Sequence, residues 1–189
     1  MAITRLGGAN AITGTLPAAN INDTSIGNVT SLPAGVGGKV LQVVQTLKTD
    51  TFTTASASYV DLTGGSVTIT PSSASNKILV MAYVVLSNIT DTAASFFRVV
   101  RDSTAIGGGT AVSNRISAAG SFYPPQTYST GVSGWHYLDS PSSTSSLTYK
   151  IQIAAESGYT ATVGRSGQDS DAAHTGRYPS IITVMEIAG

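Results

Sequence analysis

The chain has 189 residues and a mass of 19.2 kDa, which suits one domain with an appendage and suffices for a hydrophobic core. Its ten basic and ten acidic residues are only 11% of the sequence and cancel, so no basic stripe predicts nucleic-acid binding. Cysteine is absent, which excludes disulfides and thiolate chemistry, and the 25 serines and 25 threonines favour strands and turns over helices.

Residues 1–38 differ in composition from the rest, being rich in Gly, Ala, Asn, Thr and Pro. Their aliphatic residues are isolated, with a spacing that fits neither a helix nor a regular strand. Such a segment is either a disordered tail or an extended arm that orders only against a partner or against copies of itself. We favour the arm, because a solvated linker has no use for regularly placed aliphatic side chains. The side chains expected to attach it are Ile12, Leu16, Ile21, Ile26 and Leu32.

From residue 39 onward the sequence predicts short strands separated by turns, and no amphipathic helix. The cleanest alternation is in residues 147–153, whose odd-numbered members are apolar and predicted to face inward. Gly64 and Gly65 are interpreted as a turn between two strands. Eight to ten strands with turn signals between them are typical of a β-sandwich, and the count favours a jelly roll for residues 39–189. The predicted strands are 39–48, 51–54, 59–62, 66–70, 78–86, 95–101, 134–139, 147–153, 159–163 and 180–187.

Residues 78–86 form the apolar stretch around which the other strands are arranged. No polar group interrupts them apart from the hydroxyl of Tyr83, whereas a strand with one wet face alternates apolar and polar residues. They are too few to cross a membrane as a helix, which needs roughly 20 apolar residues, so we expect no membrane insertion. We interpret them as a central strand that is covered on both faces.

Three of the predicted strands, 39–48, 78–86 and 180–187, are apolar on both faces. In a two-layer sandwich every strand has one outer face, which water should wet. Three dry outer faces would expose an apolar patch too large for a monomer. Packing these faces around a symmetry axis removes the patch, and we predict a homotrimer. The residues predicted for the trimer interface are Val40, Val44, Val84, Ile182 and Val184.

No sequence pattern predicts catalysis or a cofactor. His136 and His174 are far apart in the chain and are interpreted as surface or structural residues. Asp169 and Asp171 could approach one calcium ion, but no glycine follows in the register of a calcium loop. The sequence therefore predicts a protein that is not an enzyme.

Aromatic residues in the second half of the chain raise the possibility of carbohydrate binding, because sugars are held by aromatic faces and polar neighbours. Trp135 and Tyr137 lie in a strand pattern and are predicted to be core residues. Tyr123 and Tyr128 lie in a loop that contains Pro124 and are the candidates for a glycan contact.

Several stretches resemble virion proteins of tailed bacteriophages, especially marine and cyanobacterial phages. The opening MAITRLGGAN and the stretch GKVLQVV at 38–44 carry the resemblance at the start of the chain. Residues 16–26 resemble attachment segments of phage tail fibres. The other similar stretches are ITPSSASNKILV at 69–80, RDSTAIG at 101–107, LDSP at 138–141 and ITVMEI at 182–187.

This resemblance implies a trimeric jelly-roll head of the tumour-necrosis-factor or C1q type in a tail fibre or a capsid decoration protein. Residues 1–38 would dock to other virion proteins, and residues 39–189 would face outward. The first residues lack the apolar segment of a signal peptide, so synthesis in the cytoplasm of the host bacterium is expected before incorporation into the virion. The alternative is a receptor-binding module that recognises host surface polysaccharide, and a polysaccharide-cleaving enzyme ranks third.

Overall fold

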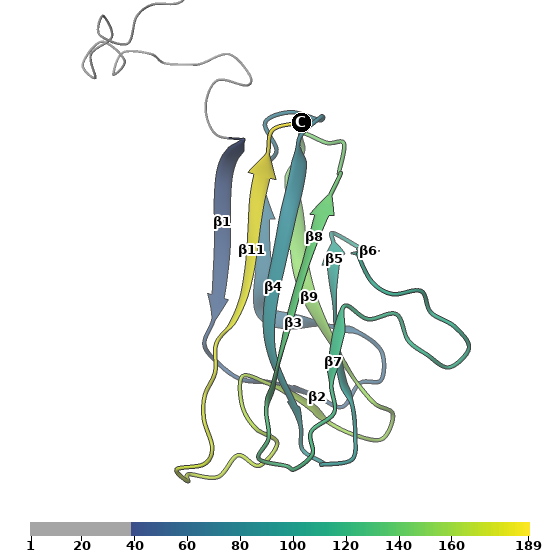
Figure 1. The fold of residues 1–189 in the computed structure, drawn as a ribbon, viewed down its shortest axis with the longest axis vertical. Helices are drawn as coiled ribbons and strands as arrows, with labels where there is room; N and C mark the ends of the chain where they lie inside the picture. Colours follow the sequence, from purple (N-terminus) through teal and green to yellow (C-terminus); the bar gives the residue numbers. More distant parts are fainter. Residues whose placement is uncertain (1–38) are drawn as a thin grey trace, which may run out of the picture. The chain divides into compact units, whose positions relative to one another are not determined.

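The computed structural model describes residues 39–189, so the predictions for residues 1–38 lie outside the described residues. Every regular element in the described part is a strand (Figure 1), which confirms the all-β class. The strands are β1 (Val40–Lys48), β2 (Phe52–Thr54), β3 (Val60–Ile69), β4 (Lys77–Asn88), β5 (Ser95–Arg101), β6 (Thr104–Ile106), β7 (Gly120–Phe122), β8 (Gly131–Asp139), β9 (Leu147–Ala155), β10 (Ala161–Val163) and β11 (Ser180–Ile187).

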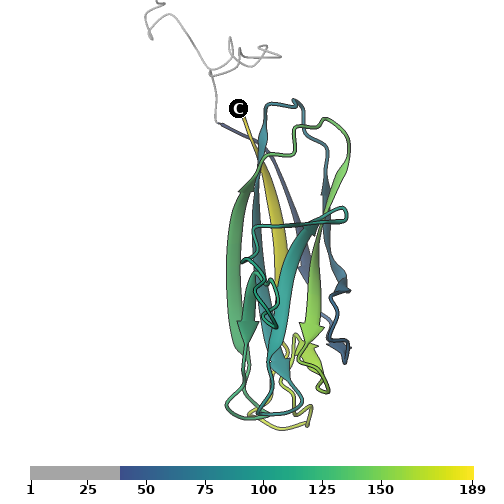
Figure 2. The same ribbon diagram turned by 90° about the vertical axis from the view of Figure 1, so that its right-hand side faces the viewer.

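The strands form two antiparallel sheets that face each other (Figure 2). The six-stranded sheet has the order β1-β11-β4-β10-β2, with β8 on the other edge of β4. The five-stranded sheet has the order β3-β9-β5-β6, and β7 also pairs with β5. The longer strands alternate between the two sheets along the chain, as in a jelly roll. The predicted β-sandwich is therefore confirmed.

The core lies between the two sheets and is built from one face of each long strand. On β9 the predicted inward residues of 147–153 are all buried, as the alternation requires. The facing row on β4 consists of the even-numbered residues from Ile78 to Leu86, which are also buried. Trp135 packs at the margin of this core and its ring stacks on that of Tyr137, which is more exposed than a core residue.

Strand β4 is central, as predicted, with β11 on one edge and β8 on the other. Its two faces differ, however. The odd-numbered residues Leu79 and Met81 are half-buried, and Tyr83 is exposed. No other described part of the chain forms a layer over this face of β4. Residues 39–189 therefore do not supply the second cover that the apolar run predicts.

The prediction of a turn at Gly64 and Gly65 is wrong, because both residues lie inside β3. Pairing with β9 shifts register between Asp61 and Ser66, which marks a bulge. Gly64 has a φ of 77°, a left-handed conformation that residues with a Cβ avoid. Two glycines here bend a continuous strand rather than end it.

The first described residue, Lys39, marks one end of the sandwich, called here the Lys39 end. The carbonyl of Lys39 accepts a hydrogen bond from the amide of Ala188, and the amide of Gly189 donates to Asn76 Oδ1. The opposite end, called here the loop end, carries the β7–β8 loop and the β10–β11 loop. These two loops are joined by a hydrogen bond from the amide of Gln168 to the carbonyl of Thr127, 2.7 Å long.

The buried carboxylate of Glu186 ties three segments together at the Lys39 end. It accepts hydrogen bonds from the side chains of Asn76, Gln42 and Ser72, and from the backbone amide of Ser72. Burial raises the pKa of Glu186, but these hydrogen bonds together outweigh it and lower that pKa to about 2. The carboxylate therefore stays charged and fastens β11 to β1 and to the β3–β4 turn.

Candidate functional site: an apolar sheet face and a polar loop hollow

The outer face of the six-stranded sheet carries three rows of side chains, each crossing β1, β11, β4 and β8. The register aligns residues of the four strands, and the pleat turns every second residue outward. Eight of these twelve positions carry a large apolar side chain and none carries Asp, Glu, Lys or Arg. The rows are Val43–Met185–Leu79–Leu138, Gln45–Thr183–Met81–His136 and Leu47–Ile181–Tyr83–Gly134. We call these twelve residues the apolar face.

Large side chains on the apolar face are open to solvent. Four of them are between 43% and 55% exposed, namely Val43, Leu47, Tyr83 and Leu138. A single exposed aliphatic residue is common on protein surfaces, but these residues are not isolated. They lie next to half-buried aliphatic and methionine side chains of β4 and β11. A continuous patch of this kind marks an interaction surface.

The apolar face is not flat. A hollow of about 210 Å³ lies beside Tyr83 and is lined by Met81, Ile181 and Thr183 as well. Across the strand pair, Tyr83 aligns with Gly134, which contributes no side chain and has open space above it. A projecting ring next to a hollow and a glycine allows interdigitation with another surface.

Three of the five residues predicted for a trimer interface are on the wrong face. Val84, Ile182 and Val184 are fully buried between the two sheets, where the chain's own five-stranded sheet covers them. Val44 is half-buried and also packs against this core, whereas Val40 is exposed at the start of β1. Because strand side chains alternate, the correct outward residues are the immediate neighbours of those chosen.

The predicted attachment residues Ile12, Leu16, Ile21, Ile26 and Leu32 lie outside the described residues. The described chain does locate the point from which that segment continues, which is Lys39. The candidate glycan residues Tyr123 and Tyr128 are both exposed and lie in the β7–β8 loop at the loop end. Lys39 and the candidate glycan contacts therefore lie at opposite ends of the sandwich.

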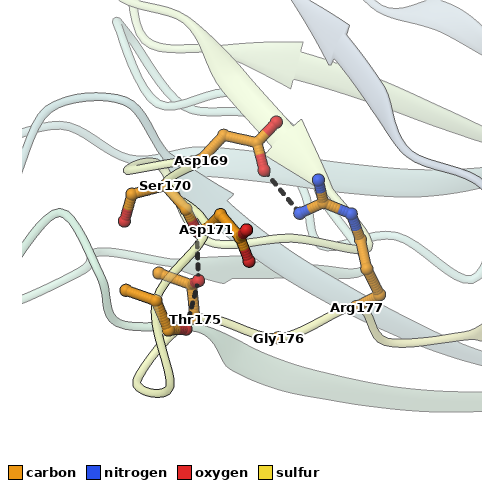
Figure 3. Close-up of a pocket in the computed structure, with 7 residues that line it drawn as sticks. Asp169, Ser170, Asp171, Thr175, Gly176 and Arg177 are labelled. Carbon is orange, nitrogen blue, oxygen red and sulfur yellow. Dashed lines mark hydrogen bonds and ion pairs between the residues drawn. The ribbon is translucent and has the colours of Figure 1, made fainter.

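A second hollow, of about 390 Å³, is formed by the β10–β11 loop at the loop end (Figure 3). Asp169 pairs with Arg177 at 2.5 Å and with Arg165 at 3.7 Å. Thr175 Oγ1 lies within hydrogen-bond distance of the carbonyl oxygens of Ser170 and Ala172. These contacts hold the loop in a defined conformation around the hollow.

The β10–β11 loop is also held against the sandwich. The guanidinium of Arg165 donates to the carbonyls of Ser166 and Gly167. The amide of Gly167 donates to Ser87 Oγ, and a Cβ at this glycine would collide with the carbonyl of Asn88. Glycine is therefore required where the loop crosses the end of β4.

Within residues 39–189 the structure does not bring together a set of metal-binding side chains. No group of three His, Cys, Asp or Glu residues is close enough to hold a metal ion. Asp169 is turned to Arg177, which removes it from the pair that the sequence offered to calcium. His136 lies on the apolar face and His174 in the loop at the opposite end from Lys39. The same residues contain no helix of the length and hydropathy needed to cross a bilayer.

A buried polar cluster joins the two sheets near the Lys39 end. Asp139 accepts hydrogen bonds from Arg101 and from the hydroxyl of Tyr149, at 2.7 to 2.8 Å. Burial, together with the hydrogen bond to Asp139, raises the pKa of Tyr149 above its ordinary range. Each group is satisfied by the others, so the cluster has a structural role.

Sequence reasoning missed the connection between Tyr128 and His174. Their rings meet edge to face, with centroids 5.7 Å apart. The two residues are far apart in the chain and lie in different loops, and no sequence pattern links them. Only the aromatic character of Tyr128 was a usable signal.

No protein-family model and no curated protein matches the chain. Among solved structures it is similar to infectious bursal disease virus of the Gt strain, with a TM-score of 0.42 and 13% identity over 78% of this chain and 38% of the other. It is also similar to T=1 particles derived from infectious bursal virus, with a TM-score of 0.42 and 12% identity over 78% of this chain and 36% of the other. The chain thus spans little more than a third of these relatives. At such identity and TM-score the likeness supports no conclusion about function.

Proposed function

We propose that the chain is a virion structural protein of a tailed bacteriophage, either a tail fibre or a capsid decoration protein. It assembles as a homotrimer through the apolar face and docks to other virion proteins through residues 1–38. Its role is binding without turnover, in the mature virion, after synthesis in the host bacterial cytoplasm. The observation that carries the assembly is the apolar face itself, and the assignment to a phage rests on the resemblance described above.

The apolar face supports self-association for two reasons. Its twelve positions have no charged side chain, so a partner gains nothing there from opposite charge. A surface that is apolar and carries both a projecting ring and a hollow suits contact between identical copies around a closed symmetry axis. The choice of three copies comes from the resemblance.

The first test is the mass of the full-length protein in solution. We expect light scattering after size-exclusion chromatography to give about three times the 19.2 kDa of one chain at micromolar concentration. A soluble monomer that is stable under these conditions contradicts the proposed assembly. A dimer or a larger ring would keep the interface and correct the number of copies.

The second test concerns the attachment of the protein to the particle. Removing residues 1–38 leaves the whole described fold with its own core, so we expect an assembled head. Three weak attachment segments acting together supply avidity, and the truncated head should lose it. Particle decoration is measured by co-sedimentation with virions that lack the protein. A truncated head that still decorates them contradicts the proposed role of the segment.

A second candidate function is recognition of host surface polysaccharide. It is favoured by the exposed rings of Tyr123 and Tyr128, which lie at the opposite end of the sandwich from Lys39. A glycan array checks it, with binding expected for the full chain and lost in Tyr123→Ala. A blank array together with normal particle assembly would leave the purely structural function. Clear activity in a reducing-sugar assay would instead overturn our expectation that the protein is not an enzyme.

A further inference from the structure

The hollow of the β10–β11 loop has an unusual balance of charge. Its lining carries the carboxylates of Asp169 and Asp171 and the guanidinium of Arg177, and Arg165 also approaches Asp169. The carboxylate of Asp169 forms ion pairs with Arg165 and Arg177. Asp171 has no hydrogen bond or ion pair with any described residue, and its carboxylate lies toward the interior of the hollow (Figure 3). The site therefore offers one available acceptor group beside a guanidinium that is more than half exposed.

These charges exclude two classes of ligand. A divalent cation needs several oxygen ligands, whereas Asp171 is the single acidic group here that is not already paired. An anion attracted to Arg177 would meet the carboxylates of Asp169 and Asp171 at the same time. A neutral molecule that both donates and accepts hydrogen bonds can use Asp171 and Arg177 together without meeting an opposing charge.

Two aromatic rings in contact with each other belong to the loops at this end of the sandwich. His174 belongs to the same loop, between lining residues Ala172 and Thr175, and its ring meets that of Tyr128. Both rings belong to exposed residues. Sugar rings combine hydroxyl groups with apolar C–H faces, which match polar groups next to aromatic rings.

We propose that this hollow binds a neutral carbohydrate. A sugar hydroxyl donates to the Asp171 carboxylate, Arg177 donates to a sugar oxygen, and the rings of Tyr128 and His174 contact the apolar face of an adjoining sugar unit. The proposal rests on the second candidate function above and identifies the site and the ligand class. It does not depend on the apolar face or on residues 1–38.

The test measures binding of the full chain to immobilised dextran, mannan and galactan by biolayer interferometry, with polygalacturonate as the acidic comparison. We expect binding to at least one neutral polymer and at least a tenfold loss of affinity in Asp171→Ala. Because Asp171 has no partner to lose, this variant should keep the thermal unfolding temperature of the parent. The matched control is Asp91→Ala, which removes an exposed acid from the β4–β5 loop outside the hollow and should bind like the parent.

Each other outcome overturns the proposal. Binding to polygalacturonate alone contradicts the neutral class, and no binding to any neutral polymer contradicts the site altogether. If Asp171→Ala binds with the same affinity as the parent, the carbohydrate does not contact Asp171. If that variant binds and Tyr123→Ala does not, polysaccharide recognition stands and this hollow is not its site. Particle decoration, measured on the same variants, reports separately on the structural function.

Discussion

The outer faces of the two sheets differ in the polarity of their side chains. The outer face of the five-stranded sheet carries a network of charged and polar groups: Asp61 pairs with Lys150 and accepts from Gln152, and Arg98 donates to Gln152. The outer face of the six-stranded sheet has twelve aligned positions without Asp, Glu, Lys or Arg. Both sheets pack on the same core with their inner faces. Core packing therefore does not explain why their outer faces differ in polarity. In the proposed assembly the polar face meets solvent and the apolar face meets protein.

The largest difference between the two faces is expected when a charged residue is placed on each of them. In Met81→Asp we expect the assembly to dissociate, because an unpaired carboxylate buried in an interface costs about 3–5 kcal/mol. The concentration needed for association should rise by at least about 100-fold. Thr68→Asp, on the outer face of the other sheet, should assemble like the parent. Sedimentation velocity on both variants gives the answer, and equal behaviour would remove the distinction between the faces.

Glu186 is a charged residue of the six-stranded sheet that is buried and does not lie on the apolar face. Its pKa of about 2 lies below the ordinary value of 4.5, so the folded state gains stability above about pH 4.5 and loses it as the pH falls toward 2. The gain corresponds to about 3 kcal/mol. In Glu186→Gln we expect the free energy of unfolding to be lower at pH 7 and to depend less steeply on pH in this range. Urea titrations at pH 7 and pH 3 measure both; an unchanged pH slope would mean that other acids set it.

The inward and outward residues of one sheet can be compared by truncation. Val84→Ala should lower the free energy of unfolding by about 2 kcal/mol, because it leaves a cavity in the core. Val43→Ala, on the apolar face, should change it by less than about 0.5 kcal/mol when association is absent. Both are measured by urea denaturation in the Met81→Asp background. Similar losses would mean that Val43 is also a core residue.

A small effect is also expected on the polar face. Hydrogen bonds from Lys150 and Gln152 lower the pKa of Asp61, but the pair is open to solvent. We expect Asp61→Asn to change the free energy of unfolding by less than about 1 kcal/mol, and the change to shrink further in 1 M salt. A larger loss that persists in salt would show that this face is covered as well.

Local patterns predicted most of the fold. Period-two alternation predicted the inward face of β9, and the uninterrupted apolar run predicted that β4 is central. The same reasoning failed at Gly64 and Gly65, because a bulge and a turn use the same residue. Among the three-residue strands, β2 and β10 were predicted from their β-branched and aromatic residues, whereas β6 and β7 were missed because so short a segment has no period to detect.

The candidate sites were predicted less well. A strand that is apolar on both sides carries no signal for which side faces the core, so Val84 was assigned to an interface and Tyr83 was not. Tyr123 and Tyr128 were found by residue type and a neighbouring proline, and both are exposed. The contact of Tyr128 with His174 and the pairing of Asp169 with Arg177 depend on two long loops meeting at one end of the sandwich.

By itself, the sequence determined the all-β class, the central strand and an excess of apolar surface, because these follow from composition and from the two-residue period of a strand. Only the tertiary structure decided which face holds that excess. The direction in which a doubly apolar strand turns is set by the sheet that packs against it, and that sheet comes from distant parts of the chain. The excess lies on the odd-numbered side of β4, centred on Leu79, Met81 and Tyr83.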